Sequence, residues 1–325
     1  MIQLVYTVCS ISQIPFALAL GKDLQKYEPN TQFVIGLADR LPSNWPVETF
    51  PIISADELGL PFLSEMAERY TVDEFTRSLK PYFASYLEKR YQASKIIFLE
   101  SQTQLFQSLT KTWQILEEYD IVLSPNITQQ RNPKNPINEP TFLNAGLYNA
   151  GFWAYKPSIQ AESFLSYWKA RTKEKGYFDF CHGFGAEQLW LNFIPIFQEK
   201  VYIQSEIGIH YHPYNWVENP LSIDENGHYV VAQSFPLHIL QWQHLTLDSS
   251  KKYFNNQLGV PTSTLKVLKQ LHSQYIKSLI PYQKYGQHTP SMGKMMIQNN
   301  KNFLSAAIEK GCLKMIKWIE EFEIQ

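Results

Sequence analysis

The chain has 325 residues, enough for one large α/β domain with an added segment or for two small domains. Hydrophobic residues make up 44% and charged residues 18%, which is typical of a packed globular protein and excludes a disordered one. The formal net charge of -1 gives no global positive field, which excludes nucleic acid as an electrostatically attracted partner.

The cysteines and the apolar segments indicate the compartment. Cys9, Cys181 and Cys312 form no CxxC pair, which favours a reducing environment. The first twenty residues are apolar, but no Lys or Arg precedes them and Pro15 interrupts them, so a strand and a helix are expected rather than a secretory signal. No run approaches about 18 apolar residues. We therefore expect a cytoplasmic protein without a transmembrane segment, for which peripheral contact with a membrane stays open.

The first elements form a β-α-β pattern. Residues 2–8 are β-rich, residues 15–27 have a helical pattern, and residues 32–37 form a second apolar run. A strand, a helix of a dozen residues and another strand predict two parallel strands. Residues 41–56 are rich in proline and polar residues and are expected to be a connection.

A helical stretch and two further strands follow. Apolar residues spaced four apart predict one buried helix face, namely Phe75, Leu79, Phe83 and Leu87. Pro81 lies within this stretch, so the helix either kinks there or restarts with Pro81 in its first turn. Residues 95–99 and 120–124 are two more apolar runs and predict buried strands.

The next segments continue the alternation. Residues 126–140 carry three prolines and several amide side chains and are expected to be a loop. Residues 147–155 predict a strand, residues 161–172 a helix and residues 187–197 a short helix. The expected fold is α/β, with a mainly parallel twisted sheet flanked by helices.

The pattern beyond Lys251 is helical to the end of the sequence. Its expected packing residues are Ile276, Ile280, Met315, Ile319 and Phe322. We therefore predict a domain over residues 1–248 and a helical C-terminal extension over residues 249–325 that packs on it.

Polar residues lie near the ends of three predicted strands: Thr7, Asp39 and Glu100. In an open parallel α/β sheet, ligands bind outside the carboxyl ends of the strands. The pattern therefore predicts a small-molecule site at this edge but does not name the ligand.

Five blocks in order carry a resemblance to a known family. They are Tyr70–Glu74 with Ser78–Pro81, Lys95–Glu100, Gly146–Phe152, Glu187–Trp190 and Pro236–His238. Together they resemble bacterial glycosyltransferases of the GT-A type related to family eight, and the set covers roughly residues 1–245. The resemblance implies a GT-A-like fold and transfer of a hexose-type residue from a nucleotide diphosphate sugar, with a UDP-sugar favoured. The implied acceptor is a glycan, a lipid-linked sugar or a protein.

The resemblance also implies roles for particular residues. The nucleoside would be contacted by Tyr6, Thr7 and Asp39, and the diphosphate by Arg77 and Lys80. The donor sugar would be surrounded by Asn149, Glu187 and Gln188, with Glu187 and Gln188 at the reacting centre.

In the resembled family, two aspartates and a histidine hold a divalent cation such as Mn²⁺ or Mg²⁺. Mapped by block, these ligands fall on Glu100, Gln102 and His238, so the Asp-x-Asp motif of the family is degenerate here. Gln102 is neutral and a poorer ligand for a hard cation than a carboxylate. The sequence therefore predicts weak or absent metal dependence.

Two other classes of function stay open. A non-catalytic relative would bind a sugar nucleotide without turnover. A sugar-phosphate nucleotidyltransferase would share the nucleotide-binding sheet, but it should have a glycine-rich basic loop after the first strand. Residues 9–13 contain no glycine, which counts against this second class.

Overall fold

The computed structural model describes residues 2–43, 45–46, 49–131, 139–243, 245, 254 and 259–295. One compact unit spans Met1–Lys294 and a second spans Met295–Gln325. The first unit thus includes residues 249–294, which the sequence assigned to the C-terminal extension. The expected packing residues Met315, Ile319 and Phe322 lie outside the described residues.

A seven-stranded sheet forms the centre of the first unit, in the order β10-β6-β7-β4-β1-β2-β3. Its strands are β1 (Ile2–Cys9), β2 (Gln32–Leu37), β3 (Ile52–Ser54), β4 (Ala93–Leu99), β6 (Ile121–Pro125), β7 (Tyr148–Tyr155) and β10 (Val201–Ile203). Within this sheet β7 is antiparallel to both β4 and β6, while the other paired strands are parallel. The carboxyl ends of β1, β2 and β4 and the start of β7 therefore share one edge.

Shorter strands pair outside the central sheet. They are β5 (Thr103–Leu105) with β14 (Ile239–Gln241), β8 (Phe178–Asp179) with β9 (Phe184–Gly185), and the group β11 (Leu221–Ile223), β12 (Tyr229–Val231) and β13 (Phe235–Pro236). The β5–β14 pair is antiparallel and begins three residues after Glu100. It therefore brings residue 241 opposite residue 103, close to the carboxyl edge of the sheet.

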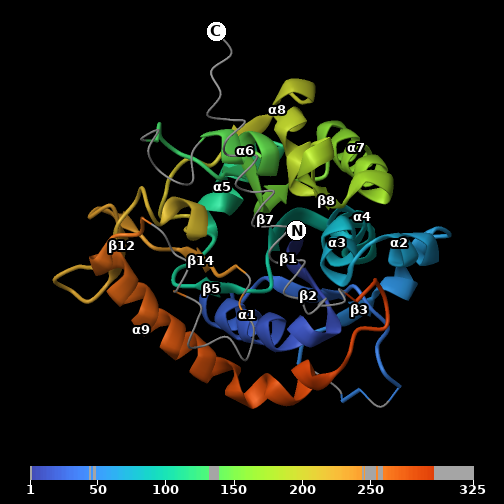
Figure 1. Ribbon diagram of the computed structural model, residues 1–325, viewed down its shortest axis with the longest axis horizontal. Coiled ribbons are helices and arrows are strands. Elements are labelled where there is room, and N and C mark those ends of the chain that lie inside the picture. The colour runs from blue at the N-terminus through green and yellow to red at the C-terminus, as the bar shows by residue number, and fades with distance from the viewer. Residues whose placement is uncertain are drawn as a thin grey trace, which may run out of the picture. The chain divides into compact units, whose positions relative to one another are not determined.

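Helices cover both faces of the sheet (Figure 1). The α-helices are α1 (Ile14–Tyr27), α2 (Leu63–Arg69), α3 (Val72–Ser78), α4 (Lys80–Tyr91), α5 (Thr110–Glu118), α6 (Glu139–Ala145), α7 (Ile159–Lys175), α8 (Ile194–Phe197) and α9 (Thr262–Leu279). The 3₁₀ helices are η1 (Ile11–Gln13), η2 (Ala55–Leu58), η3 (Phe180–His182), η4 (Gln188–Phe193), η5 (Pro213–Asn215) and η6 (Ile280–Gln287).

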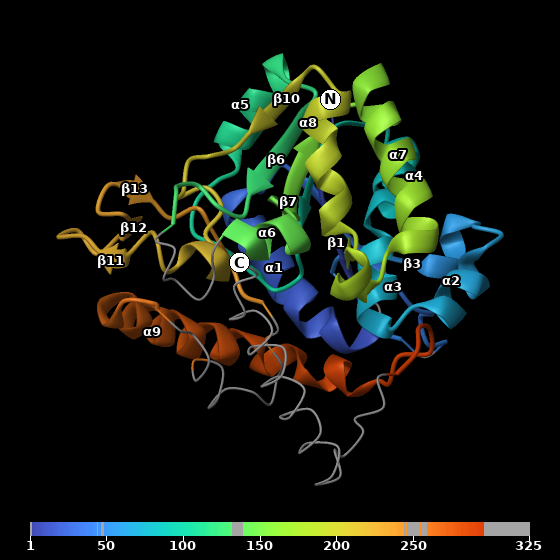
Figure 2. The ribbon, with the colours of Figure 1, turned by 45° about the horizontal axis from the view of Figure 1, so that its top comes forward.

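Each face of the sheet has its own buried core, because successive side chains of a strand point to opposite faces. On one face Tyr6 and Phe98 pack with Phe83 of α4 and Trp168 of α7. On the other face, apolar side chains of β1, β2 and β4 pack on α1 and α5. In both ribbon views α4 and α7 lie side by side on the first face (Figures 1 and 2). This three-layer arrangement confirms the predicted α/β class.

A third core joins α9 to the segment before it. Leu268 and Tyr275 of α9 are buried with Trp216 and Trp242. The helix lies alongside α1 (Figure 2), and η6 continues it across η1. The helical pattern predicted beyond Lys251 is therefore confirmed over residues 262–287, whereas the described residues 288–295 form no helix and Ile280 is exposed rather than packed.

The remaining predicted elements agree with the structure except in detail. The helix restarts at Lys80, so Pro81 lies in the first turn of α4 rather than at a kink. The expected connection at 41–56 contains the short edge strand β3, and the segment 187–197 is largely 3₁₀. The part of the chain that the structure describes contains no helix both long and apolar enough to cross a bilayer.

Candidate functional site

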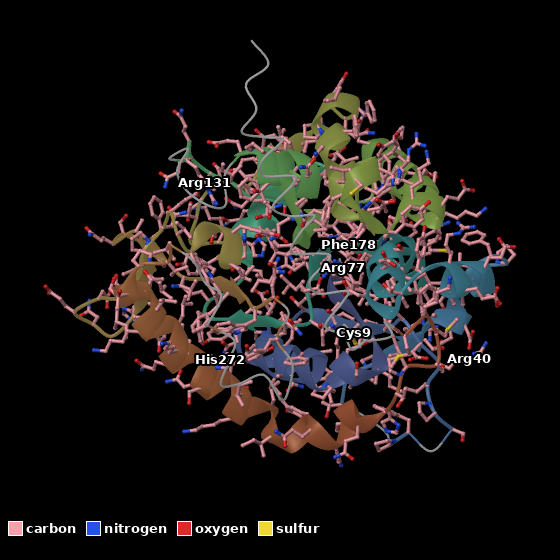
Figure 3. The ribbon with its side chains drawn as sticks, viewed as in Figure 1. Cys9, Arg40, Arg77, Arg131, Phe178 and His272 are labelled. Carbon is pink, nitrogen blue, oxygen red and sulfur yellow. The ribbon has the colours of Figure 1, made fainter. Side chains whose placement is uncertain are left out.

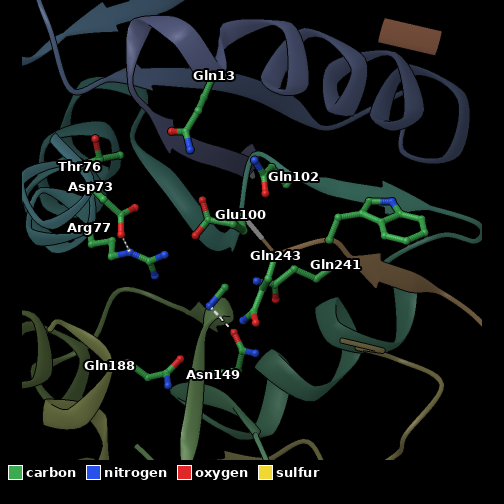
Figure 4. A pocket seen from close by; sticks show the side chains of 12 residues that line it. Gln13, Asp73, Thr76, Arg77, Glu100, Gln102, Asn149, Gln188, Gln241 and Gln243 are labelled. Atoms are coloured by element: carbon green, nitrogen blue, oxygen red, sulfur yellow. Dashed lines mark hydrogen bonds and ion pairs between the residues drawn. The ribbon is translucent and has the colours of Figure 1, made fainter. Parts of the chain in front are cut away.

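A pocket opens at the shared edge of the sheet (Figure 4). Glu100 follows β4, Arg77 comes from α3, and Gly151 lies on β7. Six of the lining side chains are carboxamides: Gln13, Asn149, Gln102, Gln188, Gln241 and Gln243. A carboxamide both donates and accepts hydrogen bonds, so this part of the lining suits a neutral group that carries several hydroxyls.

The break between α3 and α4 places two cations beside the pocket. Thr71 caps α3 through a capping box with Glu74, and α3 ends at Ser78. Arg77, in the last turn of α3, donates from Nε to Asp73 at 2.8 Å and lines the pocket. Lys80 then opens α4 and points its ammonium group behind the pocket wall.

Lys80 is almost fully buried and holds three oxygen atoms. Its Nζ donates to Glu187 at 2.7 Å, to Glu100 at 2.9 Å and to the carbonyl of Ala150 at 3.2 Å. Burial by itself lowers the pKa of Lys80, but Glu100 and Glu187 outweigh that effect and the pKa lies above its ordinary value. Lys80 is therefore charged, and it cross-links the end of β4 to η4.

Glu187 is the most buried carboxylate of this cluster, with no exposed side-chain surface. Besides Lys80, the Arg77 guanidinium lies 3.5 Å from its Oε1, while Oε2 has no partner among the described residues. Burial raises the pKa of Glu187, yet Lys80 and Arg77 hold it below its ordinary value. Ala186, just before it, has a left-handed φ of 51°, a conformation that non-glycine residues adopt at some cost.

The predicted reacting centre is thus divided by the pocket wall. Gln188 lines the pocket, whereas Glu187 lies behind it. The amide of Gln188 is already bonded, because Nε2 donates to the carbonyl of Ala145 and Oε1 accepts from the N–H of Ala150. The acidic side chains that do reach the pocket are Glu100 and Asp73.

The predicted diphosphate contact of Lys80 needs a similar correction. Its three hydrogen bonds use all of its N–H groups, and its side chain is 1% exposed. Arg77 keeps a position on the pocket surface. Of the two cations, Arg77 therefore faces a ligand directly, and Lys80 acts by holding the carboxylates in place.

The side-chain amide of Asn149 has its oxygen bonded and its nitrogen without a partner among the described residues. Its Oδ1 accepts from the N–H of Gly151 at 2.7 Å, and its Nδ2 is buried without a partner among the described residues. A buried amide group without a partner is costly. The unpaired Nδ2 of Asn149 is therefore the kind of donor that a bound ligand would satisfy.

The three predicted metal ligands do not come together. Gln102 bonds the backbone of Leu245 twice, with Oε1 accepting at 3.1 Å and Nε2 donating at 2.6 Å. His238 lies outside the pocket, where its Nδ1 is 3.2 Å from the carbonyl oxygen of Ser108. The side chain that reaches the pocket from this strand is Gln241. This corrects the assignment of His238.

The residues present do not fit a divalent cation. Of the two carboxylates that line the pocket, Glu100 is paired with Lys80 and Asp73 with Arg77. The side chains of Gln102 and Gln241 are neutral. Within the described ranges, no three His, Cys, Asp or Glu side chains are grouped so that they could hold an ion. Hard cations prefer several oxygen ligands with anionic charge. The described residues at the pocket therefore do not supply the donor set that the resemblance implied.

The three residues predicted to contact the nucleoside are all buried under other parts of the chain. Tyr6 lies in the core, and its hydroxyl donates to the carbonyl of Lys80, so a nucleoside contact is not supported for it. Thr7 lies in β1, two residues before its end, and is fully buried, with Oγ1 unpartnered among the described residues. Asp39 is at the expected edge, but Ser291 donates to its carboxylate from both the backbone N–H and the hydroxyl.

We call residues 288–294 the strap. It crosses the nucleoside end of the predicted site and is held at three points. Ser291 bonds Asp39, Met292 is buried in the core of the first face, and Lys294 pairs with the backbone on both sides of Thr71. Gly293 has a φ of 85°, and a Cβ there would lie 2.7 Å from the Cα of Val72, so glycine is required.

Sequence reasoning missed Gln241, Asp73 and Ser291. Asp73 follows the helix start that the resemblance identified, four residues before Arg77, a spacing that brings two helix side chains together. Gln241 is three residues from His238, an odd offset that turns a strand side chain to the opposite face. Nothing in the sequence indicates that Ser291 meets Asp39.

No model of a known protein family matches the sequence, and no curated protein matches it. Among solved structures, the chain is similar to the galactosyltransferase LgtC in complex with donor and acceptor sugar analogs. The two share 12% sequence identity and a TM-score of 0.48, and the aligned part covers 89% of this chain and 98% of that one. The glycosyltransferase GlyE of Streptococcus pneumoniae TIGR4 is similar at 14% identity and a TM-score of 0.49, covering 90% and 67%.

A glycosyltransferase involved in glycosylation of the major capsid of PBCV-1 is similar at 8% identity and a TM-score of 0.42, covering 74% of this chain and 93% of that one. These are distant likenesses of overall structure. At such values they carry no argument about function, which has to come from the residues of the pocket.

Proposed function

We propose that this protein transfers a sugar residue from a nucleotide diphosphate sugar, with a UDP-sugar favoured, to a hydroxyl group of an acceptor. The observation that carries the proposal is the carboxamide-lined pocket with Arg77 at the carboxyl edge of the sheet. Amide groups match sugar hydroxyls, and a guanidinium matches phosphate oxygens. The order of the sequence blocks that resemble glycosyltransferases supports the same assignment.

In this proposal Asn149 and the neighbouring carboxamides bind the donor sugar, and Arg77 binds the diphosphate. The bond between the anomeric carbon and the diphosphate breaks, and the acceptor oxygen bonds to that carbon as it loses its proton. Glu100 is the pocket carboxylate proposed to receive this proton, since part of its surface faces the pocket. The acceptor class is a glycan, a lipid-linked sugar or a protein.

We further propose that the reaction does not require a divalent cation. The support is the neutral character of Gln102 and Gln241, together with the pairing of both pocket carboxylates: Glu100 is paired with Lys80 and Asp73 with Arg77. Negative charge on the leaving diphosphate would be stabilised by Arg77 and by amide donors fixed before the reaction begins.

Donor entry requires part of the site to open. The free space in the pocket is about 70 Å³, well below the roughly 300 Å³ at the lower end of small-molecule sites. The strap covers the end of the site where the nucleoside is expected, at Asp39. We propose that the strap moves when the nucleotide binds, so that the ribose replaces Ser291 as the partner of Asp39.

A second candidate is a protein that binds a sugar nucleotide without turnover. The charge of the cluster favours it: the three carboxylates of Asp73, Glu100 and Glu187 face the two cations Arg77 and Lys80, which leaves one net negative charge. Such a cluster gives little stabilisation to the additional negative charge that develops on a leaving diphosphate, which disfavours turnover more than binding.

The test is a thermal-shift panel of UDP-, GDP-, CMP- and dTDP-sugars, followed by release of the nucleotide from the donor that stabilises the protein most. The released nucleotide is CMP for a CMP-sugar and the nucleoside diphosphate for the others. A ligand that binds the native state raises its melting temperature. Release is measured with Mn²⁺ and with EDTA. We expect one class of donor to bind and equal release in both conditions.

The variant Arg77→Gln should release less product, whereas Arg90→Gln, which removes an exposed ion pair with Glu57, should behave as wild type. Binding without release in either condition would favour the second candidate. The absence of a thermal shift with every donor would contradict both candidates.

A further inference from the structure

One wall of the pocket is formed where β14 passes β7. Gln241, the last residue of β14, is 3% exposed, and its backbone N–H donates to the carbonyl of Tyr211 at 2.9 Å. Its amide packs on Gly151, where a Cβ would lie 2.4 Å from Oε1 and 2.5 Å from Nε2. Gly151 therefore leaves the space that the Gln241 amide occupies.

His210 contacts this amide from behind the wall. Its Nε2 is 2.7 Å from Oε1 of Gln241, and its Nδ1 is 2.8 Å from Oγ of Ser124. The ring is buried, and this burial, with His212 close by, lowers its pKa well below the ordinary value. The imidazole is therefore neutral at neutral pH and carries a single N–H.

The Ser124 hydroxyl decides which nitrogen carries that hydrogen. Ser124 is buried, and among the described residues its Oγ has no partner except His210. If Nδ1 carried the hydrogen, the hydroxyl hydrogen of Ser124 would be buried without an acceptor. The satisfied arrangement has Ser124 donating to Nδ1 and Nε2–H of His210 donating to Oε1 of Gln241.

The amide of Gln241 is thereby oriented. With Oε1 bound to His210, the NH₂ group takes the other side of the amide, where the described residues offer it no hydrogen-bond acceptor. Across Gly151, Asn149 is oriented in the same way, because its Oδ1 is bound and its Nδ2 is unpartnered. Figure 4 shows Gln241 and Asn149 at the same wall.

We propose that Gln241 binds the ligand by donating a hydrogen bond from Nε2, paired with Asn149, and that Ser124 and His210 are positioning residues that fix this orientation. The acceptor is an oxygen atom of the donor, on the sugar or on the diphosphate. Because the inference names a ligand contact, it rests on the proposed function. A fixed donor pair costs no reorganisation when charge develops on the bound oxygen.

The first test needs no ligand. The tautomer of His210 is read from its ¹⁵N chemical shifts in the wild-type protein, with the signal assigned by its loss in His210→Phe. We expect hydrogen on Nε2. In Ser124→Ala, which removes the donor to Nδ1, the population with hydrogen on Nδ1 should rise. Hydrogen on Nδ1 in the wild type would overturn the orientation argued for Gln241.

The second test measures affinity for UDP-galactose and for UDP by calorimetry. Gln241→Met keeps the length of the side chain and removes the donor, so the Kd for UDP-galactose should rise about tenfold, the loss of one hydrogen bond in a desolvated site. A rise with UDP-galactose alone places the contact on the sugar, and an equal rise with UDP places it on the diphosphate.

His210→Phe and Ser124→Ala should weaken binding less than Gln241→Met, because the donor remains but its orientation is free. Gln198→Met is the matched control, since Gln198 is a buried carboxamide bonded to Ser163 and neither residue lines the pocket. Wild-type affinity in Gln241→Met would overturn the inference and leave the proposed function standing. If the wild-type protein binds no donor of the thermal-shift panel, the inference and the proposed function fail together. The tautomer of His210 still shows whether Ser124 and His210 orient Gln241.

Discussion

Replacing Lys80 by methionine removes the cation closest to Glu187 and should strongly destabilise the protein at neutral pH. The Nζ of Lys80 is 2.7 Å from a carboxylate with no exposed surface. Removing one partner of a buried pair costs about 3–5 kcal/mol when the remaining charge has no other partner. Arg77 stays 3.5 Å from Glu187 but is also bonded to Asp73, so we expect a loss near the lower end of that range. Glu100 also loses this partner, but it is 17% exposed and water compensates it in part.

The stability difference between the wild type and Lys80→Met should depend on pH, because it depends on the charge of Glu187. In the wild type the pKa of Glu187 is depressed, so its contribution is present above the unfolded-state pKa, about 4.3, and is lost as the pH falls through the lower folded-state value. In Lys80→Met the effect of burial dominates and raises that pKa above the unfolded-state value. The deficit of the variant relative to the wild type should therefore grow as the pH rises from about 4 and then level off.

The assay is urea unfolding of the wild type, Lys80→Met and Lys80→Met/Glu187→Gln between pH 5 and pH 8. In the double variant position 187 carries no charge, so most of the stability should return and its difference from the wild type should vary less with pH. A deficit of the same size at pH 5 and pH 8 would refute the reasoning. So would a double variant as unstable as Lys80→Met.

Three further outcomes are expected. Gly151→Ala places a Cβ 2.4 Å from the amide of Gln241, so the amide must move and its buried bond to His210 is lost. The melting temperature should fall, and nucleotide release should fall at least tenfold; unchanged release would show that the amide position is unimportant. Ser291→Ala removes a hydroxyl bond to Asp39; it should loosen the strap and lower the Kd for UDP by calorimetry, whereas a higher Kd would mean that Ser291 helps to bind the nucleotide. Gln102→Asp adds a carboxylate to the pocket and should raise Mn²⁺ affinity measured by calorimetry, and an unchanged affinity would mean that residue 102 is not at the position of a metal ligand.

The main strands could be predicted from sequence because their apolar runs are long and bounded by polar residues. The runs that became β1, β2, β4 and β6 were found in this way. The opposite direction of β7 could not be predicted, since apolar periodicity is the same for parallel and antiparallel strands.

The site was predicted in position more successfully than in detail. Glu100 and Asp39 lie at the expected edge, because the carboxyl ends of parallel strands meet there. The burial of Lys80 was missed, since it depends on Glu187 approaching from 107 residues away. Gln241 was missed because matching a short sequence block does not determine which residue of the following strand points its side chain into the pocket.

The strap also sets an order of events during synthesis of the chain. Asp39 and Ser291 are separated by 252 positions, so at roughly 5–20 residues per second about 13–50 s pass between their addition. During that interval the carboxylate of Asp39 has the N–H of Arg40 as a partner but not Ser291. A nucleotide present in this window would meet the sheet edge before the strap exists, and the strap would then have to close around it or remain displaced.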